Sequence, residues 1–264
     1  MKFMSKADRW IESTLRAPRA ECRLFCLAYA GGSSAIYSSW PRALSEVAEV
    51  LPIQLPGRGS RMGEKPFTDL SQAVQAIHDD LLPLFQEKPF AFFGHSMGAT
   101  IGFEVTRKLR SEDGIRPFAI FASGRQAPHI PDRYEPLYDL PHDQFIEQLR
   151  RLNGTPKEVF EHRELLELVV PILRADFQAI DNYRYVPAEP LECPIIALGG
   201  EEDQDIPRED FEAWRTHTNQ DFRCRIFPGD HFYLHSQQPA LLRELAQEIR
   251  RRRPVEEKTS NLKF

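Results

Sequence analysis

Short apolar runs alternate along the chain with longer segments in which apolar and polar positions follow a helical period. Two of the runs, residues 89–93 and 194–198, are almost wholly apolar, as expected of strands that helices cover on both faces. Repeated passage from strand to helix predicts a parallel sheet wrapped by helices. The six predicted strands are residues 23–29, 47–55, 89–93, 117–123, 194–199 and 222–227.

The amphipathic segments predict the helices between these strands. In the longest of them, Val74, Ile77 and Leu81 recur at steps of three and four residues, which places one apolar stripe against a sheet. Pro83 is expected to disturb the last turn of that helix. The fold class is therefore predicted as α/β, with a doubly wound and mostly parallel sheet. The predicted helices are residues 35–44, 70–85, 97–111, 208–216 and 239–253.

One region breaks this alternation. Roughly 70 residues separate the strand that ends at Ser123 from the strand that opens after Cys193, whereas such connections usually span about 2–6 residues. Residues 143–152 and 161–183 have helical periodicity, so we expect an ordered helical insertion over residues 128–187. Lids over active sites are often built this way. We interpret residues 1–264 as one domain with a helical lid and, at 254–264, a flexible polar tail.

Composition excludes several classes of protein. Hydrophobic residues make up 41% and charged residues 28%, as in globular proteins, and no run approaches a membrane-spanning length. The first residues carry charge throughout and lack the apolar core of a secretion signal. The net charge of -5 offers no basic excess to a polyanion. We expect a cytoplasmic protein that binds neither nucleic acid nor a membrane.

Cysteines and glycines give no sign of a metal or a nucleotide cofactor. The four cysteines have neither CxxC spacing nor histidine companions, and HExxH is absent, so no metal site is predicted. Gly31-Gly32 lacks the GxGxxG pattern of a phosphate-binding loop. We interpret the cysteines as reduced, buried and unreactive thiols. They are Cys22, Cys26, Cys193 and Cys224.

The sharpest chemical signal is Gly94-His95-Ser96-Met97-Gly98, which follows an apolar strand and leads into a helical run. This context is that of a nucleophile elbow, where the serine takes a strained backbone conformation and a Cβ at either glycine would clash. By composition alone GxSxG is expected only about 0.04 times in such a chain. Ser96 is therefore predicted as a nucleophile.

A serine hydroxyl needs a base to remove its proton, and the base needs an acid to orient it. In sheets with this elbow the chain order is serine, then acid, then histidine. Asp203 follows the apolar strand 194–198 and is the predicted acid, because Ile206 can resume packing beneath it. Asp205 is the second candidate for the acid.

Among the histidines, His231 is the predicted base, because the turn after strand 222–227 presents it at the edge of the sheet. His235, one helical turn further, is the runner-up. His95 is expected to pack inside the elbow, and His129 is a candidate for substrate contact. The remaining four are expected at the surface. They are His78, His142, His162 and His217.

The loop after the first strand supplies a candidate oxyanion hole. Such a hole needs two backbone N–H donors, one from the residue after the nucleophile and one from the first loop. The first is Met97, and the second is placed on Ala30, with Tyr29 or Gly31 as alternatives. A different interpretation of this loop is a turn in which Ser33 or Ser34 caps the next helix.

Taken together with further motifs, these features resemble the stand-alone (type II) thioesterases of polyketide, non-ribosomal peptide and fatty acid synthesis. The resemblance spans residues 25 to 234 and departs from the family pattern at Ala28, at Asp230 and at Asp205, two residues past Asp203. The residues that carry it are Ala28-Tyr29-Ala30-Gly31-Gly32 with Trp40; Gln54-Leu55-Pro56-Gly57-Arg58 and Arg61; Lys88-Pro89-Phe90-Ala91-Phe92-Phe93-Gly94-His95-Ser96-Met97-Gly98; Gly154-Thr155-Pro156; Leu173-Arg174-Ala175-Asp176; Pro194, Gly199-Gly200 and Asp203; and Phe227-Pro228-Gly229 with His231-Phe232-Tyr233.

The resemblance implies an α/β-hydrolase with a helical lid and a Ser96–Asp203–His231 triad. It implies a substrate that is an acyl or aminoacyl thioester on the phosphopantetheine arm of an acyl or peptidyl carrier protein, with no cofactor of the enzyme's own. We expect a monomeric editing enzyme. A general carboxylesterase or lipase would use the same triad, and a carrier-binding module without activity is the alternative of another class.

No substrate-binding residue is assigned from the sequence. The apolar residues of the predicted lid either line an acyl channel or close a small helical core, and both interpretations stay open. These residues are Phe145, Leu149, Leu152, Phe160 and Phe177.

Overall fold

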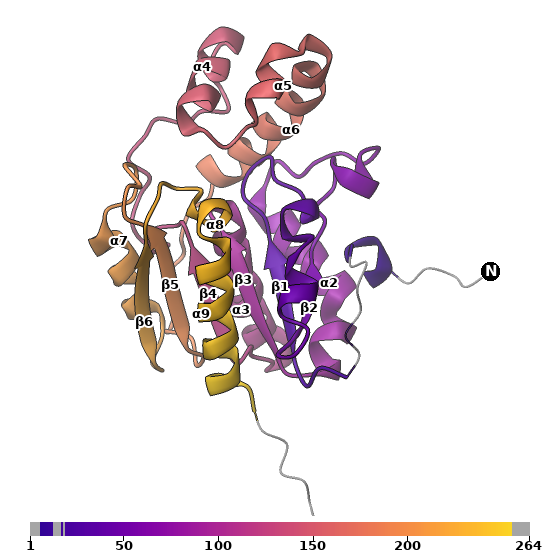
Figure 1. The fold of residues 1–264 in the computed structure, drawn as a ribbon, viewed down its shortest axis with the longest axis vertical. Helices are drawn as coiled ribbons and strands as arrows, with labels where there is room; N and C mark the ends of the chain where they lie inside the picture. Colours follow the sequence, from indigo (N-terminus) through magenta and orange to yellow (C-terminus); the bar gives the residue numbers. More distant parts are fainter. Residues whose placement is uncertain (1–5, 13–16, 18, 255–264) are drawn as a thin grey trace, which may run out of the picture.

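The computed structural model describes residues 6–12, 17 and 19–254, so the predicted tail lies outside the described residues except for Pro254. Within that part of the chain, six strands form one sheet in the order β2-β1-β3-β4-β5-β6, and every neighbouring pair is parallel (Figure 1). The predicted α/β fold with a parallel sheet is confirmed. The strands are β1 Arg23–Leu27, β2 Glu49–Pro52, β3 Phe90–His95, β4 Ala119–Ser123, β5 Ile195–Gly200 and β6 Phe222–Phe227.

Helices cover both faces of this sheet (Figure 1). None of the helices in the described ranges is long and apolar enough to cross a bilayer. The helices outside the predicted insertion are α1 Trp40–Ala43, α2 Leu70–Glu87, α3 Met97–Asp113, α7 Arg208–Glu212, α8 Tyr233–Ser236 and α9 Gln238–Arg252. Short 3-10 helices occupy Ala7–Arg9, Ser34–Tyr37, Gly59–Arg61 and Ala213–His217.

Successive residues of each central strand enter opposite cores. On β1, Phe25 belongs to the core shared with α2 and α3, whereas Leu24 belongs to the core shared with α1 and α9. The same alternation places Phe92 and Phe93 of β3 on opposite faces. Since all four side chains are fully buried, each contributes about 1.5–3 kcal/mol to folding. Burial on both faces explains why the central strands are continuously apolar.

Several element boundaries differ from the predicted ones. The expected helix 35–44 is a 3-10 turn followed by α1, because Pro41 has no N–H with which to continue a preceding helix. The expected helix 208–216 divides into α7 and a second 3-10 turn. The expected disturbance at Pro83 does not end α2, which continues past the proline to Glu87.

Between β4 and β5 the chain forms three helices, α4 His142–Leu152, α5 Lys157–Glu161 and α6 Arg163–Asp181, which lie together at one end of the sheet (Figure 1). The predicted helix 161–183 is interrupted at His162, where the backbone is extended. Phe145 of α4 meets Phe177 of α6 edge to face, with ring centroids 6.0 Å apart. These side chains join the core on the α2 and α3 side of the sheet.

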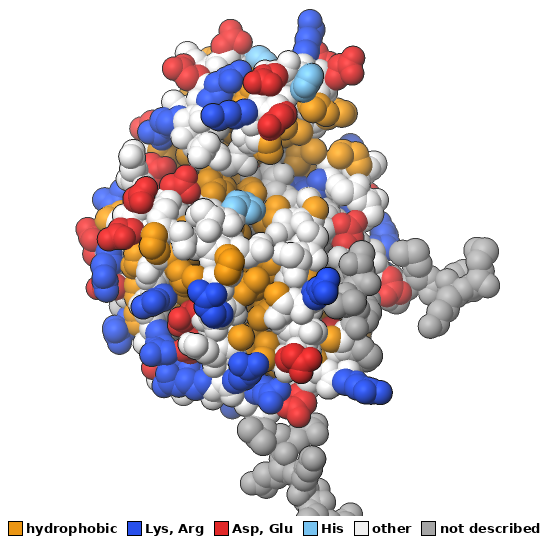
Figure 2. Space-filling view, in the orientation of Figure 1, with side chains coloured by type: hydrophobic (Ala, Val, Ile, Leu, Met, Phe, Trp, Pro, Cys, Tyr) orange, Lys and Arg blue, Asp and Glu red, His pale blue; other side chains and the backbone are white. Residues whose placement is uncertain are grey.

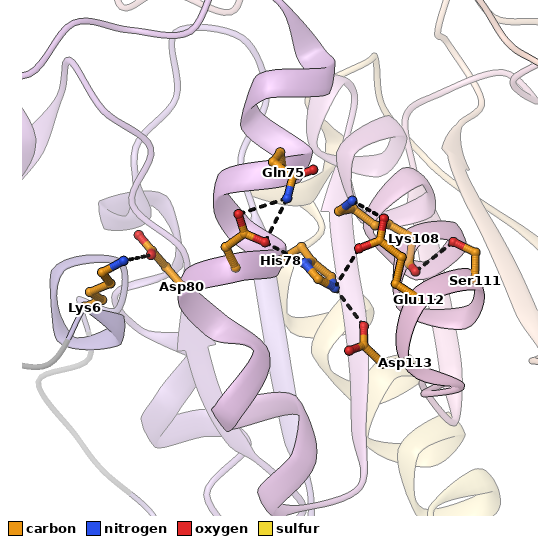
Figure 3. Close-up of polar contacts among 9 residues, drawn as sticks. Lys6, Gln75, His78, Asp80, Lys108, Ser111, Glu112 and Asp113 are labelled. Atoms are coloured by element: carbon orange, nitrogen blue, oxygen red, sulfur yellow. Dashed lines mark hydrogen bonds and ion pairs between the residues drawn. The ribbon is translucent and has the colours of Figure 1, made fainter.

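A polar cluster links α2 to the end of α3 (Figure 3). His78 Nε2 lies 2.7 Å from Asp113 Oδ2, and His78 Nδ1 lies 2.9 Å from Asp79 Oδ1. Beside them, Lys108 pairs with Glu112 at 2.5 Å. The prediction that His78 lies at the surface is wrong: only 5% of the residue is exposed, because the C-terminal end of α3 packs over it.

Candidate active site

Ser96 occupies the strained turn between β3 and α3, with φ 53 and ψ -118. A Cβ at Gly94 would overlap the backbone of Gly98, and a Cβ at Gly98 would overlap the carbonyl of Leu27. The N–H of Ser96 donates to the carbonyl of Ser123 at 2.8 Å. The turn is therefore held from β1, from β4 and from its own helix, which sustains a conformation that serine alone would avoid.

His95 lies beneath the turn and is fully buried. Its Nδ1 is 2.8 Å from Ser123 Oγ, which in turn is 2.6 Å from the hydroxyl of Tyr233. Burial, and then the neighbouring ring of His231, hold the pKa of His95 well below its usual range. His95 is therefore a neutral packing residue, in agreement with its predicted place inside the elbow.

The structure brings Asp203 to His231: Oδ2 of the carboxylate lies 2.7 Å from Nδ1 of the ring. The other oxygen, Oδ1, accepts the backbone N–H groups of Asp205 at 3.1 Å and Ile206 at 3.2 Å. The Asp203 side chain is 1% exposed, while that of Asp205 is 40% exposed and lies 4.0 Å from Arg151. Of the two candidate acids, only Asp203 contacts the predicted base.

The runner-up histidine has a different partner. His235 Nε2 lies 3.1 Å from the hydroxyl of Tyr29, and their rings meet edge to face. Burial lowers the pKa of His235, an effect that the charge of Asp230 opposes. His235 supports the first loop instead of contacting an acid.

Ser96 and His231 line the same cavity, at the end of the sheet below α4 and α6. In the space-filling view, hydrophobic side chains show in the hollow between this helical region and the body of the molecule (Figure 2). Among the described residues no hydrogen bond joins Ser96 Oγ to His231; such catalytic contacts are often long without substrate and tighten when it binds. Apolar walls come from Leu149, Leu152, Leu173, Phe177 and Ile180.

Two backbone donors also lie at this cavity. Met97 is the first residue of α3, where helix geometry leaves an N–H without an intrahelical partner. In the first loop, the N–H of Gly31 donates to Asp176 Oδ2 at 2.7 Å, so Gly31 is occupied. Ala30 lines the cavity beside Met97. Ser33 does accept the N–H of Ala35, at 3.4 Å, so the same loop also caps the 3-10 turn that follows.

Two histidines are placed differently from their predictions. His129, predicted to contact substrate, instead lies with its Nδ1 2.7 Å from His217 Nε2. His217, predicted at the surface, is 5% exposed because Phe103 and Trp214 pack around its ring. Burial, followed by the neighbouring His129 and Arg107, lowers the pKa of His217 to about 4. This pair belongs to the packing beside β5 and not to the cavity.

In the part of the chain that the structure describes, no group of three or more His, Cys, Asp or Glu side chains could hold a metal ion. All four cysteines are free. Burial raises the pKa of Cys22 to about 11 and that of Cys193 to about 12, so both thiols are protonated at neutral pH.

Comparisons with known proteins identify the family. The model of the thioesterase domain family matches residues 22–249. Linear gramicidin dehydrogenase LgrE of Brevibacillus parabrevis is 47% identical over 89% of this chain and 90% of its own. Gramicidin S biosynthesis protein GrsT of Aneurinibacillus migulanus is 40% identical over 95% of this chain and 97% of its own.

The solved structure of the type II thioesterase BorB, from the borrelidin biosynthetic cluster, is 34% identical, with a TM-score of 0.81 over 91% of this chain and 96% of that chain. The name of LgrE denotes a dehydrogenase, but this chain has the GxSxG elbow and lacks the GxGxxG pattern of dinucleotide sites. The chain therefore belongs to the type II thioesterases of the thioesterase domain family, and it is a hydrolase with the α/β-hydrolase fold.

Proposed function

We propose that this protein removes acyl and aminoacyl groups from the phosphopantetheine arms of acyl or peptidyl carrier proteins, as an editing enzyme of a polyketide, non-ribosomal peptide or fatty acid assembly line. One observation carries the proposal: in a chain of the thioesterase family, the elbow serine and a histidine bonded to an aspartate line the same cavity. The names of GrsT and BorB link those relatives to gramicidin S and borrelidin biosynthesis.

The chemistry runs through an acyl-enzyme. Ser96 Oγ attacks the thioester carbonyl while His231 Nε2 takes its proton, and the C–S bond then breaks and the thiol leaves with that proton. Water next attacks the acyl-serine, giving one proton to His231, and the acid is released as the serine recovers its proton. Asp203 holds the ring through Nδ1 and stabilises its charged form.

Negative charge develops on the carbonyl oxygen in both steps. The N–H groups of Ala30 and Met97 are the proposed donors that hold it. Because sulfur is a good leaving group, its protonation adds little to the barrier, and attack and charge stabilisation dominate it. Loss of a single oxyanion donor costs about 10²–10³ in kcat in a serine hydrolase.

We propose residues 128–187 as a lid within a single domain. Leu149 and Leu152 of α4 and Leu173 and Phe177 of α6 line the cavity, which suits them to hold an apolar acyl group. Phe145, by contrast, is fully buried between the helices and closes their core. We therefore propose an acyl-binding role for Leu149, Leu152 and Phe177 and a packing role for Phe145.

We further propose that the enzyme is a cytoplasmic monomer. The four free cysteines fit a reducing compartment. Light scattering of the purified protein at micromolar concentration is expected to give the mass of one chain; a dimer mass would overturn the monomer.

A general carboxylesterase would use the same residues, and an inactive carrier-binding module would not need the strained serine turn. A panel of carrier-bound acyl and aminoacyl thioesters, each with its oxygen ester at matched acyl chain, separates these functions. We expect hydrolysis of many short acyl groups and faster turnover of thioesters than of oxygen esters. Faster oxygen-ester cleavage would favour the carboxylesterase, activity on one long chain would favour a product-releasing enzyme, and no turnover would favour the binding module.

A further inference from the structure

Two motifs found in the sequence take no part in the chemistry above: Pro56-Gly57-Arg58 and Leu173-Arg174-Ala175-Asp176. Their last residues are 118 positions apart and meet in the structure. Arg58 Nη1 donates to Asp176 Oδ2 at 2.5 Å and Nη2 donates to Oδ1 at 2.8 Å, a bidentate pair. Arg58 is 4% exposed and Asp176 3%, so the pair is buried.

The same pair forms hydrogen bonds to two backbone groups of the first loop. Asp176 Oδ2 accepts the N–H of Gly31 at 2.7 Å, and Arg58 Nη1 donates to the carbonyl of Gly32 at 3.4 Å. Arg58 is itself fixed, since its Nε donates to the carbonyl of Pro56 at 3.1 Å. A carboxylate on α6 therefore fixes the peptide that joins Ala30 to Gly31, and a guanidinium after β2 contacts the carbonyl of Gly32.

The loop lies close against α6 at this point. Gly31 has φ +77, and a Cβ there would overlap the side chain of Leu173. Asp176 is on the same helix, and Leu173 also lines the cavity. The hydrogen bond from the N–H of Gly31 fixes the orientation of the peptide that joins Ala30 to Gly31. The peptide directly before it carries the N–H of Ala30, which is the proposed oxyanion donor.

Stability alone is a weak reason for such a pair. Removing two charges from water costs several kcal/mol, and well-packed apolar residues often serve the core as well or better. Here every hydrogen bond of the pair outside itself goes to a backbone group of a loop, and one loop carries Ala30. The pair is placed to fix geometry.

We infer that Asp176 and Arg58 are positioning residues that aim the N–H of Ala30 at the oxyanion, and that this donor is in place only while α6 is packed on the first loop. The inference rests on the proposed function, because it takes Ala30 as an oxyanion donor. It makes the lid helix part of the catalytic apparatus: the segment that covers the acyl group also sets the donor.

The test compares Asp176→Asn with a matched carboxylate-to-amide change in another buried arginine pair, Glu49→Gln. Glu49 lies 3.1 Å from Arg23, with side chains 5% and 8% exposed, and Arg23 opens β1 at the end opposite the first loop. In Asp176→Asn the amide directs a donor at Arg58, which is itself a donor. Turnover of an acyl-pantetheine thioester, the melting temperature and the fraction of enzyme titrated by a fluorophosphonate are measured for both variants.

We expect both variants to melt at a lower temperature, and only Asp176→Asn to lose kcat, by about 10–100-fold per titrated site with KM within about twofold, as for a misplaced catalytic group. Affinity for a trifluoromethyl ketone analogue, which forms a tetrahedral adduct, should fall by a similar factor, while affinity for the matched unreactive thioether stays unchanged. If the pair only stabilises the fold, the affinity of Asp176→Asn for the two ligands should fall together or not at all.

Unchanged kcat in Asp176→Asn, or an equal loss in Glu49→Gln, would overturn the inference. If Asp176→Asn does not fold, Arg58→Lys replaces it: the charge stays, one of the two parallel bonds is lost, and a fall in kcat of about fivefold or more is expected. Wild-type kcat in that variant would equally overturn the inference. A wild-type enzyme without thioesterase activity would instead refute the proposed function.

Discussion

Two histidine–aspartate contacts of equal length lie in different parts of this molecule. His231 Nδ1 is 2.7 Å from Asp203 at the cavity, and His78 Nε2 is 2.7 Å from Asp113 between α2 and α3 (Figure 3). The second nitrogen of His78 is also bonded, to Asp79. Among the described residues no hydrogen bond reaches Nε2 of His231, which lines the cavity with Ser96. The free nitrogen, and not the carboxylate partner, distinguishes the proposed base from the structural link.

The surroundings of the two rings differ as well. Burial lowers the pKa of His78, but the hydrogen bonds with Asp79 and Asp113 outweigh it, and the net pKa is raised. The two carboxylates therefore stabilise the protonated form of the His78 ring. At the cavity, the backbone holds the carboxylate that contacts the ring: the second oxygen of Asp203 accepts two backbone N–H groups, which fix its position.

The largest expected effect comes from removing the group that His231 is proposed to activate. Ser96→Ala should lower kcat/KM for an acyl-pantetheine thioester by about 10⁴-fold or more, since removal of one triad member disables the unit. Ser33→Ala, on the neighbouring loop, is the control and should stay within a few-fold of wild type. Near-wild-type hydrolysis by Ser96→Ala would refute the nucleophile.

Exchanging the same side chain at both contacts tests the comparison itself. His231→Gln should lower kcat/KM by about 10⁴-fold or more, with little change in the free energy of unfolding. His78→Gln should leave kcat unchanged and lower the free energy of unfolding by about 0.5–1.5 kcal/mol, because the hydrogen bond that links α2 to Asp113 of α3 is lost. Urea denaturation and steady-state kinetics measure both. If His78→Gln lost the activity and His231→Gln only the stability, the assignment would be reversed.

The acids give a smaller graded series. Asp203→Asn should lower kcat by about 10³–10⁴-fold, because an amide selects the wrong tautomer of His231. Asp205→Asn should change kcat less than about threefold, since its side chain is half exposed and lies near Arg151. A larger loss for Asp205→Asn than for Asp203→Asn would move the acid to Asp205.

The smallest expected effect is on the pH dependence of stability. A raised pKa in the folded state means that the protonated His78 stabilises the fold below about pH 6.5 and that this contribution is lost as pH rises through the folded pKa. The difference in unfolding free energy between wild type and His78→Gln should therefore shrink as the pH rises above about 6.5. A difference that grows with pH would contradict the charged link.

The sheet and the elbow could be predicted because they depend on neighbours in sequence. Strand 89–93 is apolar throughout, and a Cβ at Gly94 would overlap Gly98 within the same turn. Helix ends were less predictable: the break within residues 35–44 follows from the missing N–H of Pro41, which apolar periodicity does not register.

The remaining features depend on residues that only the fold brings together. Arg58 and Asp176 were visible as motif residues, but nothing local predicted that they meet at Gly31. The pattern of the amphipathic helix predicts a surface position for His78. Its partner Asp113 lies on the following helix, so nothing near His78 in the sequence predicts the contact. Pairing between distant polar groups is decided by tertiary packing, so a sequence pattern predicts the candidates and not the pairs.

The central claim is that the reaction passes through an acyl group on Ser96. Acid quenching of the enzyme during turnover of an acyl-pantetheine thioester, followed by peptide mass spectrometry, tests this directly. We expect the mass of the acyl group on the peptide that contains Ser96, with no adduct in Ser96→Ala. An acyl group on another residue, or steady hydrolysis by Ser96→Ala, would contradict the account.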